Sequence, residues 1–164
     1  NQATYLWNPP TQVRGPSYMG RFDHRINDNQ SVFARYIHAD NNTLRSGKGV
    51  ILWVYGENKR IPPGPPRRPG ERLLPPPPKE QTAASRLLAE RIQGRLRKRG
   101  IRTPHYVDRG PFAVLKGPAM ASVLVEAANL RDKKEAAQLK DPAFLDRLAA
   151  ALAEACAEHL KTRD

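Results

Sequence analysis

Residues 49–55 read Gly49-Val-Ile-Leu-Trp-Val-Tyr55, a nearly continuous apolar run. A run of this kind is typical of a strand buried on both faces, as in a sheet covered by helices. Three shorter runs are also rich in β-forming residues, and they lie at residues 32–37, 112–115 and 122–126. We therefore expect strands at these four places, with residues 49–55 in the interior of the sheet.

Three helices are expected after the strand at residues 49–55. Residues 82–99 place Leu88, Ile92 and Leu96 on one face, with Ala84 and Leu87 beside it, and Gly100 ends the helix.

Further along the chain, Asp132 begins a short helix, with Glu135 in the position of a capping-box partner. Asp141-Pro142 starts the last helix, which has an apolar stripe of Leu145, Leu148, Leu152 and Ala155. Strands alternating with helices predict an α/β fold with a mostly parallel, twisted sheet flanked by helices.

A proline-rich stretch interrupts this pattern, since residues 61–78 contain nine of the sixteen prolines. Proline lacks the backbone donor that helices and central strands need, so we expect a surface insertion or flexible loop over residues 61–80. A PxxP ligand is the alternative interpretation. The rest of residues 1–164 is expected to form one domain.

Composition limits the possible functions. The chain of 164 residues has 28 Lys+Arg against 16 Asp+Glu, a formal net charge of +12, and one cysteine, Cys156. A single cysteine excludes a disulfide framework within the chain, and no apolar run approaches the ~20 residues of a transmembrane helix. The charge suits nucleic acid, anionic lipid or anionic wall polymers, or simply a solvated basic face. Half of the lysines and arginines lie between Lys59 and Arg109, and the sparse aromatic residues near this basic segment argue against nucleic acid.

Two ionisable residues directly follow apolar strands, namely His38 and Glu126. Ligand sites in α/β sheets gather at the carboxyl ends of strands, and partial desolvation there adapts a carboxylate to act as a general base. The alternatives are a hydrogen-bonded structural histidine and a glutamate that caps the next turn. The other histidines, His24, His105 and His159, form no short zinc motif.

Several segments occur in the order typical of one enzyme family. They are Val32-Phe-Ala-Arg-Tyr-Ile-His-Ala-Asp-Asn41, Ser85-Arg-Leu-Leu-Ala-Glu-Arg-Ile-Gln93, Asp108-Arg-Gly-Pro-Phe-Ala-Val-Leu-Lys116, Ala121-Ser-Val-Leu-Val-Glu126 and the segment from Asn129 through Glu135 to Phe144. Together they resemble the zinc-dependent N-acetylmuramoyl-L-alanine amidases of the amidase_3 type. Asn27 stands where that family has an asparagine in a helix leading into the strand before His38.

The resemblance implies a peptidoglycan hydrolase that acts outside the cytoplasmic membrane, in the periplasm or extracellularly, as an autolysin does. His38 would be a Zn²⁺ ligand, and Glu126 would be the catalytic carboxylate that takes a proton from zinc-bound water. The bond cleaved would join N-acetylmuramic acid to L-alanine of the stem peptide. Peptidoglycan is then the expected partner, and no nucleic acid is expected.

The family's first histidine and glutamate ligands have no counterpart in this chain. A zinc site normally has three protein ligands, so we expect the domain to be incomplete at its N-terminus, an expectation that the missing initiator Met and signal peptide favour. The alternative is a catalytically inactive amidase-like module that binds peptidoglycan or another envelope component.

Overall fold

The computed structural model describes residues 18–27 and 30–38 as backbone, and residues 48–59, 75–116, 120–130 and 132–161 with their side chains. These residues fall into two compact units. The first contains an antiparallel hairpin of β1 (Tyr18–Asn27) and β2 (Gln30–His38), in which Phe22 pairs with Ala34. The strand predicted at residues 32–37 is thus confirmed. Asn27, which the resemblance matches to a helix position of the family, lies instead at the end of β1 and pairs with Gln30 of β2.

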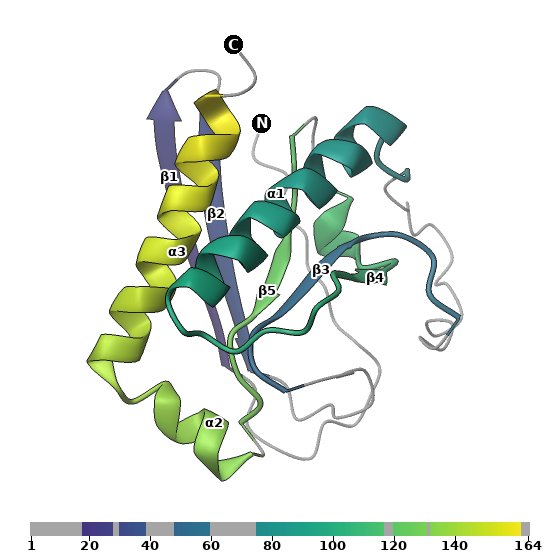
Figure 1. The fold of residues 1–164 in the computed structure, drawn as a ribbon. Coiled ribbons are helices and arrows are strands. Elements are labelled where there is room, and N and C mark those ends of the chain that lie inside the picture. The colour runs from purple at the N-terminus through teal and green to yellow at the C-terminus, as the bar shows by residue number, and fades with distance from the viewer. Residues whose placement is uncertain are drawn as a thin grey trace. The chain divides into compact units, whose positions relative to one another are not determined.

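The second unit is an α/β arrangement, as predicted (Figure 1). Its sheet has the order β4-β3-β5, with β3 (Ile51–Tyr55) between β4 (Asp108–Gly110) and β5 (Leu124–Glu126). The expected parallel pairing holds for β3 and β4, whereas β5 runs antiparallel to β3, so the sheet is mixed. Helices α1 (Lys79–Lys98) and α3 (Pro142–Lys161) lie side by side, and the short α2 (Lys133–Gln138) precedes α3 (Figure 1).

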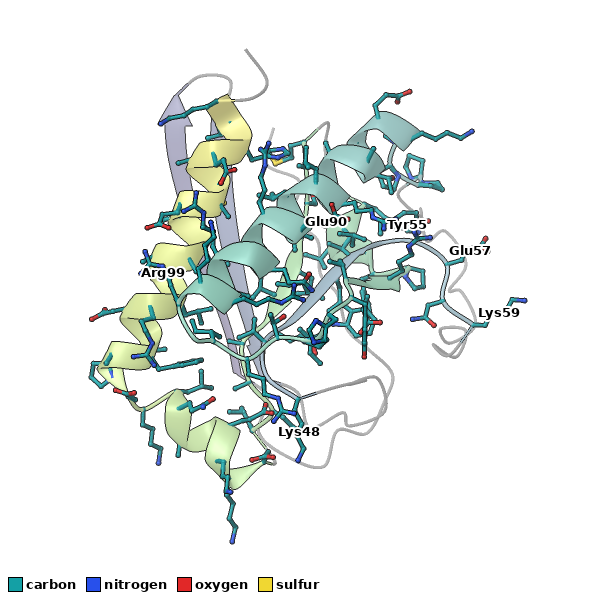
Figure 2. All side chains as sticks on the ribbon, in the orientation of Figure 1. Lys48, Tyr55, Glu57, Lys59, Glu90 and Arg99 are labelled. Carbon is teal, nitrogen blue, oxygen red and sulfur yellow. The ribbon has the colours of Figure 1, made fainter. Side chains whose placement is uncertain are left out.

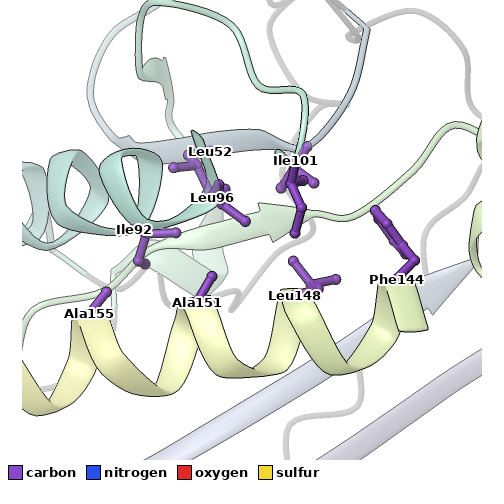
Figure 3. Packing of buried hydrophobic residues seen from close by; sticks show 9 residues of the cluster. Leu52, Ile92, Leu96, Ile101, Phe144, Leu148, Ala151 and Ala155 are labelled. Carbon is purple, nitrogen blue, oxygen red and sulfur yellow. The ribbon is translucent and has the colours of Figure 1, made fainter. Parts of the chain in front are cut away.

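Burial of β3 on both faces is confirmed. On one face, Val50 and Leu52 pack against α1 and α3 in the main core (Figure 3). That core also contains Ile92, Leu96, Ile101, Phe144, Leu148, Ala151 and Ala155. On the other face, Ile51 and Trp53 pack with Leu115, and the Trp53 ring meets Phe112 edge-on at a centroid distance of 5.2 Å.

The segment at residues 112–115 is a 3₁₀ turn, η1 (Ala113–Leu115), and not the predicted strand. Its backbone bonds run from Leu115 N–H to Phe112 O and from Lys116 N–H to Ala113 O, which is the i to i+3 pattern. This turn buries Leu115 beneath β3. The parallel neighbour of β3 is instead Asp108–Gly110, which is too short and too polar to be recognised from its composition.

The predicted helices are all present, but the faces they bury differ in part from the predicted ones. In α1, Ile92 and Leu96 are buried as expected, whereas Leu87 is 46% exposed. In α3, Leu145 is exposed, and the buried stripe is Phe144, Leu148, Ala151, Ala155 and His159. These residues recur at spacings of three and four, so they share one helical face, and Leu145 lies about 100° away from Phe144.

Gly100 ends α1 as predicted, and the geometry explains why. Its φ is +69°, a left-handed conformation that glycine adopts without steric cost. Its N–H donates to Arg97 O, and the N–H of Ile101 donates to Leu96 O. These two bonds form a Schellman motif, and Ile101 joins Leu96 in the core.

Of the expected insertion at residues 61–80, residues 61–74 lie outside the described part of the chain. Residues 75–78 have no regular secondary structure, and α1 begins directly after them at Lys79. In the described residues, no helix is both long enough and apolar enough to span a bilayer.

Candidate active site

Glu126 is the last residue of β5 and lies opposite Ile51 in the antiparallel register with β3. The strand was predicted over residues 122–126, and only its second half, Leu124–Glu126, is paired. Glu126 itself is half-buried. A half-buried carboxylate beside the central strand of a sheet is held by the core and is still reached by solvent.

Polar side chains from α1 bind the segment that enters β5. The Ser85 hydroxyl donates to Gln81 O at 2.8 Å and accepts the N–H of Ser122 at 2.9 Å. The side-chain amide of Gln81 donates to Met120 O. Ser85 is 4% exposed, so this polar contact is made inside the unit. The hydroxyl therefore fixes the backbone just before β5 to the first turns of α1.

A buried glutamate binds the segment that leaves β5. Glu135 Oε2 accepts the N–H of Asn129 at 2.8 Å, and Glu135 Oε1 accepts the N–H of Gly49, on the segment entering β3, at 2.9 Å. Lys48, the neighbour of Gly49, is labelled on this segment in Figure 2. The carboxylate thus joins two chain segments that are 80 residues apart, since Gly49 and Asn129 are at those positions in the sequence.

The predicted N-cap of α2 is confirmed. Asp132 Oδ1 accepts the N–H groups of Lys134 at 2.9 Å and Glu135 at 3.2 Å. Hydrogen bonds from the backbone of Glu135 and Lys134 lower the pKa of the Asp132 carboxyl. The reciprocal half of the predicted capping box is wrong, because Asp132 N–H donates to Asn129 O while the Glu135 carboxylate binds Gly49 and Asn129.

His38 is the last residue of β2, where it pairs with Tyr18. It belongs to the hairpin unit, whereas Glu126 belongs to the other unit. The position of His38 at a strand end agrees with the sequence, but the strand is part of a two-stranded antiparallel sheet. The shared catalytic site that the resemblance implies for His38 and Glu126 stays a prediction.

The described side chains do not by themselves fit a zinc site. Among them, no three His, Cys, Asp or Glu residues stand close enough together to hold a metal ion. His159 is buried on the inner face of α3, and His105 lies in an exposed loop. Cys156 is half-buried in α3, where burial raises the pKa of its thiol. A raised thiol pKa disfavours the thiolate that zinc prefers.

Two arginines near the C-terminal end of α1 form ion pairs with α3 at the partly exposed edge of the contact between these helices. Arg95 forms ion pairs with Glu154 at 3.3 Å and Glu158 at 2.9 Å, and Arg99 also pairs with Glu154 (Figure 2). The hydrogen bond to Glu158 raises the pKa of the Arg95 guanidinium, and the same bond lowers the pKa of the Glu158 carboxyl. These pairs join α1 to α3, so the basic charge of α1 has a structural role as well as any role in binding.

Sequence reasoning missed the structural role of two buried polar residues on α1. Ser85 and Gln93 stand on the buried face of α1, where an apolar pattern alone would place hydrophobic side chains. Polar residues at such positions are the signal that was available, because a buried polar group needs a specific partner. For Gln93 the partners are Pro104 O and Tyr106 O, in the loop that follows α1.

Comparison with known protein families gives a match over most of the chain. The family model described as N-acetylmuramoyl-L-alanine amidase matches residues 21–158. The match includes His38, Glu126 and Glu135, and it runs from β1 into the last turns of α3. No curated protein matches the chain. A match over most of the sequence, joined to an α/β fold with Glu126 at a strand end, shows that this chain belongs to the N-acetylmuramoyl-L-alanine amidase family of peptidoglycan amidases.

Proposed function

We propose that the protein hydrolyses the amide bond between the lactyl group of N-acetylmuramic acid and L-alanine of the stem peptide. The match to the amidase family over residues 21–158 is the observation that carries this proposal. The position of Glu126 supports it, since a half-buried carboxylate at the end of a fixed strand is suited to proton transfer. Because the substrate is wall peptidoglycan, the protein would act in the periplasm or outside the cell.

Glu126 acts in this proposal as the general base and then as the general acid. Its carboxylate takes a proton from the attacking water while the water oxygen bonds to the amide carbonyl carbon. When the carbon–nitrogen bond breaks, Glu126 returns the proton to the departing amine. The products are the lactyl carboxylate on the sugar and a stem peptide with a free L-alanine amino group, so atoms and charge balance.

Zinc dependence is a further part of the proposal, with His38 as one ligand. A mononuclear site usually takes three protein ligands, so His38 needs two more, and the described side chains alone include no group of three that could hold a metal ion. We expect about one zinc per molecule in the purified full-length protein, measured beside its intact mass. Absence of bound zinc together with absence of hydrolysis would instead favour a module that binds peptidoglycan without cutting it.

The decisive experiment compares Glu126→Gln with a matched control on purified peptidoglycan. Glu90→Gln is the control, because Glu90 is exposed on α1 and forms an i, i+4 ion pair with Arg86 of the same helix (Figure 2). Mass spectrometry of the soluble fraction measures release of stem peptides that begin with L-alanine. We expect at least a 100-fold loss of release in Glu126→Gln and none in Glu90→Gln. Equal release by both variants would overturn the role of Glu126.

A further inference from the structure

We infer that Glu135 is a positioning residue that holds Glu126 in place by fixing the backbone on the far side of β5. This inference rests on the proposed role of Glu126. The inference is carried by two hydrogen bonds of the Glu135 carboxylate, in which one oxygen accepts the N–H of Asn129 and the other accepts the N–H of Gly49. Asn129 follows Glu126 by three residues.

The carboxylate lies where the strand ladder stops. β3 and β5 pair from Trp53 opposite Leu124 to Ile51 opposite Glu126. If the two strands continued in the same register, Val50 would face Ala127 and Gly49 would face Ala128. The ladder ends at Ile51 and Glu126, and the N–H groups of Gly49 and Asn129 donate to the Glu135 carboxylate. Glu135 therefore bridges the two strands at the end that carries Glu126.

Only a carboxylate satisfies both donors. Each of its oxygens accepts one backbone N–H, and the side chain is 9% exposed, so water is a poor substitute. A glutamine of the same shape would offer one oxygen and would turn an NH₂ group toward the second N–H. The Asp132 cap fixes the start of α2, and with it the backbone position from which Glu135 reaches the strands.

The segment before the N-terminal end of β5 is fixed independently by Ser85, whose hydroxyl accepts the N–H of Ser122. A strand of three residues has few ladder bonds of its own, so side-chain bonds on both flanks determine where it lies. Displacement of a catalytic group by about 1 Å can lower a rate by about 100-fold. Loss of the hydrogen bonds at one end of β5 should therefore lower kcat more than it alters KM.

The test measures kcat and KM for peptidoglycan fragments with the full-length protein and its Glu135→Gln variant. We expect kcat to fall by about 10- to 100-fold with KM within about twofold of the wild-type value. The matched control is Glu154→Gln, which breaks the ion pairs to Arg95 and Arg99 at the α1–α3 contact without touching β5. This control should lower the melting temperature and leave kcat unchanged at 25 °C.

The outcomes separate this inference from the proposed function. A normal kcat in Glu135→Gln, with activity lost in Glu126→Gln, overturns the positioning role and leaves the function standing. Full activity in Glu126→Gln overturns the role of Glu126 and the inference with it. If Glu135→Gln does not fold, hydrogen exchange in the wild-type protein decides: slow exchange of the Gly49 and Asn129 amides supports the bridge, and exchange at the rate of an open loop overturns it.

Discussion

Substitution of Gly49 by alanine tests how closely the backbone is packed where the chain enters β3. Its φ is +89°, a conformation that side chains disfavour. A Cβ built on Gly49 would lie 2.2 Å from the backbone oxygen of Arg102. That same oxygen accepts the N–H of Val50 at 2.8 Å, at the point where the chain enters β3. Gly49→Ala must therefore shift the backbone and break or weaken this bond.

The expected destabilisation follows from two contributions. The left-handed backbone costs an alanine about 1–2 kcal/mol. Loss of the bond between Val50 and Arg102 adds about 0.5–1.5 kcal/mol. The sum is about 1.5–3.5 kcal/mol before any loss at Glu135, which also binds Gly49. In a chain of this size each kcal/mol lowers the melting temperature by about 2–4 °C, so we expect a decrease of roughly 3–14 °C.

The assay is thermal unfolding followed by circular dichroism, with Gly94→Ala as the matched control. Gly94 lies within α1, and a Cβ there meets no atom within 4 Å. Alanine is the better helix former by about 1 kcal/mol, so Gly94→Ala should raise the melting temperature by a few degrees. The reasoning is refuted if Gly49→Ala melts at the wild-type temperature or above it, whatever the control does.

Four further results are expected from solution measurements. Leu96→Ala should lower the free energy of unfolding in urea by about 2–5 kcal/mol, because Leu96 is 0% exposed within the main core. Asp132→Ala should lower the melting temperature, and Asp132→Asn should lower it less, since asparagine keeps a capping oxygen. The hydrogen bond with Arg95 lowers the pKa of Glu158 in the folded protein, so the ion pair stabilises the fold near neutral pH. This stabilisation should be lost as the pH falls below about 4, and Glu158→Gln should make the free energy of unfolding less dependent on pH in that range. Cys156 should react with iodoacetamide at pH 8 more slowly than it does in urea, because burial raises its thiol pKa.

For each of these four predictions, one outcome would contradict it. A loss below about 1 kcal/mol in Leu96→Ala would mean that the core around it is loosely packed. Equal melting temperatures for Asp132→Ala and the wild type would mean that the cap contributes nothing. Acid stability unchanged by Glu158→Gln would remove the ion pair with Arg95 as a source of pH dependence. Equal alkylation rates with and without urea would show that Cys156 is freely accessible.

Local patterns in the sequence predicted several elements correctly. The apolar run at residues 49–55 contains β3, and the residues from Val50 to Val54 are all buried. Gly100 ends α1, and Asp132 caps α2, as their residue types indicated. These features depend on the conformation of a few neighbouring residues, so the sequence contains the information they need.

Features that depend on contacts between distant residues were predicted less well. The run at residues 112–115 has the composition of a strand, yet it forms a turn because Leu115 fills the space beneath Ile51 and Trp53. Leu145 has the right spacing for an apolar stripe, but the contact with α1 selects the face that carries Phe144 and Leu148. Which of two possible faces is buried depends on the partner surface, and no local pattern specifies it.

The same distinction applies to the candidate site. By itself, the sequence placed Glu126 at the end of a strand and ordered its motifs as in the amidase family, because periodicity and motif order are properties of the chain. Only the tertiary structure decided how Glu126 is held. The bonds from Ser85 to Ser122 and from Glu135 to Gly49 and Asn129 form only when α1, α2, β3 and β5 have packed together. Glu135 was predicted from its sequence position to cap its own helix. It binds the backbone beside two strand ends instead, because the half-buried N–H groups there need an acceptor that only folding brings within reach.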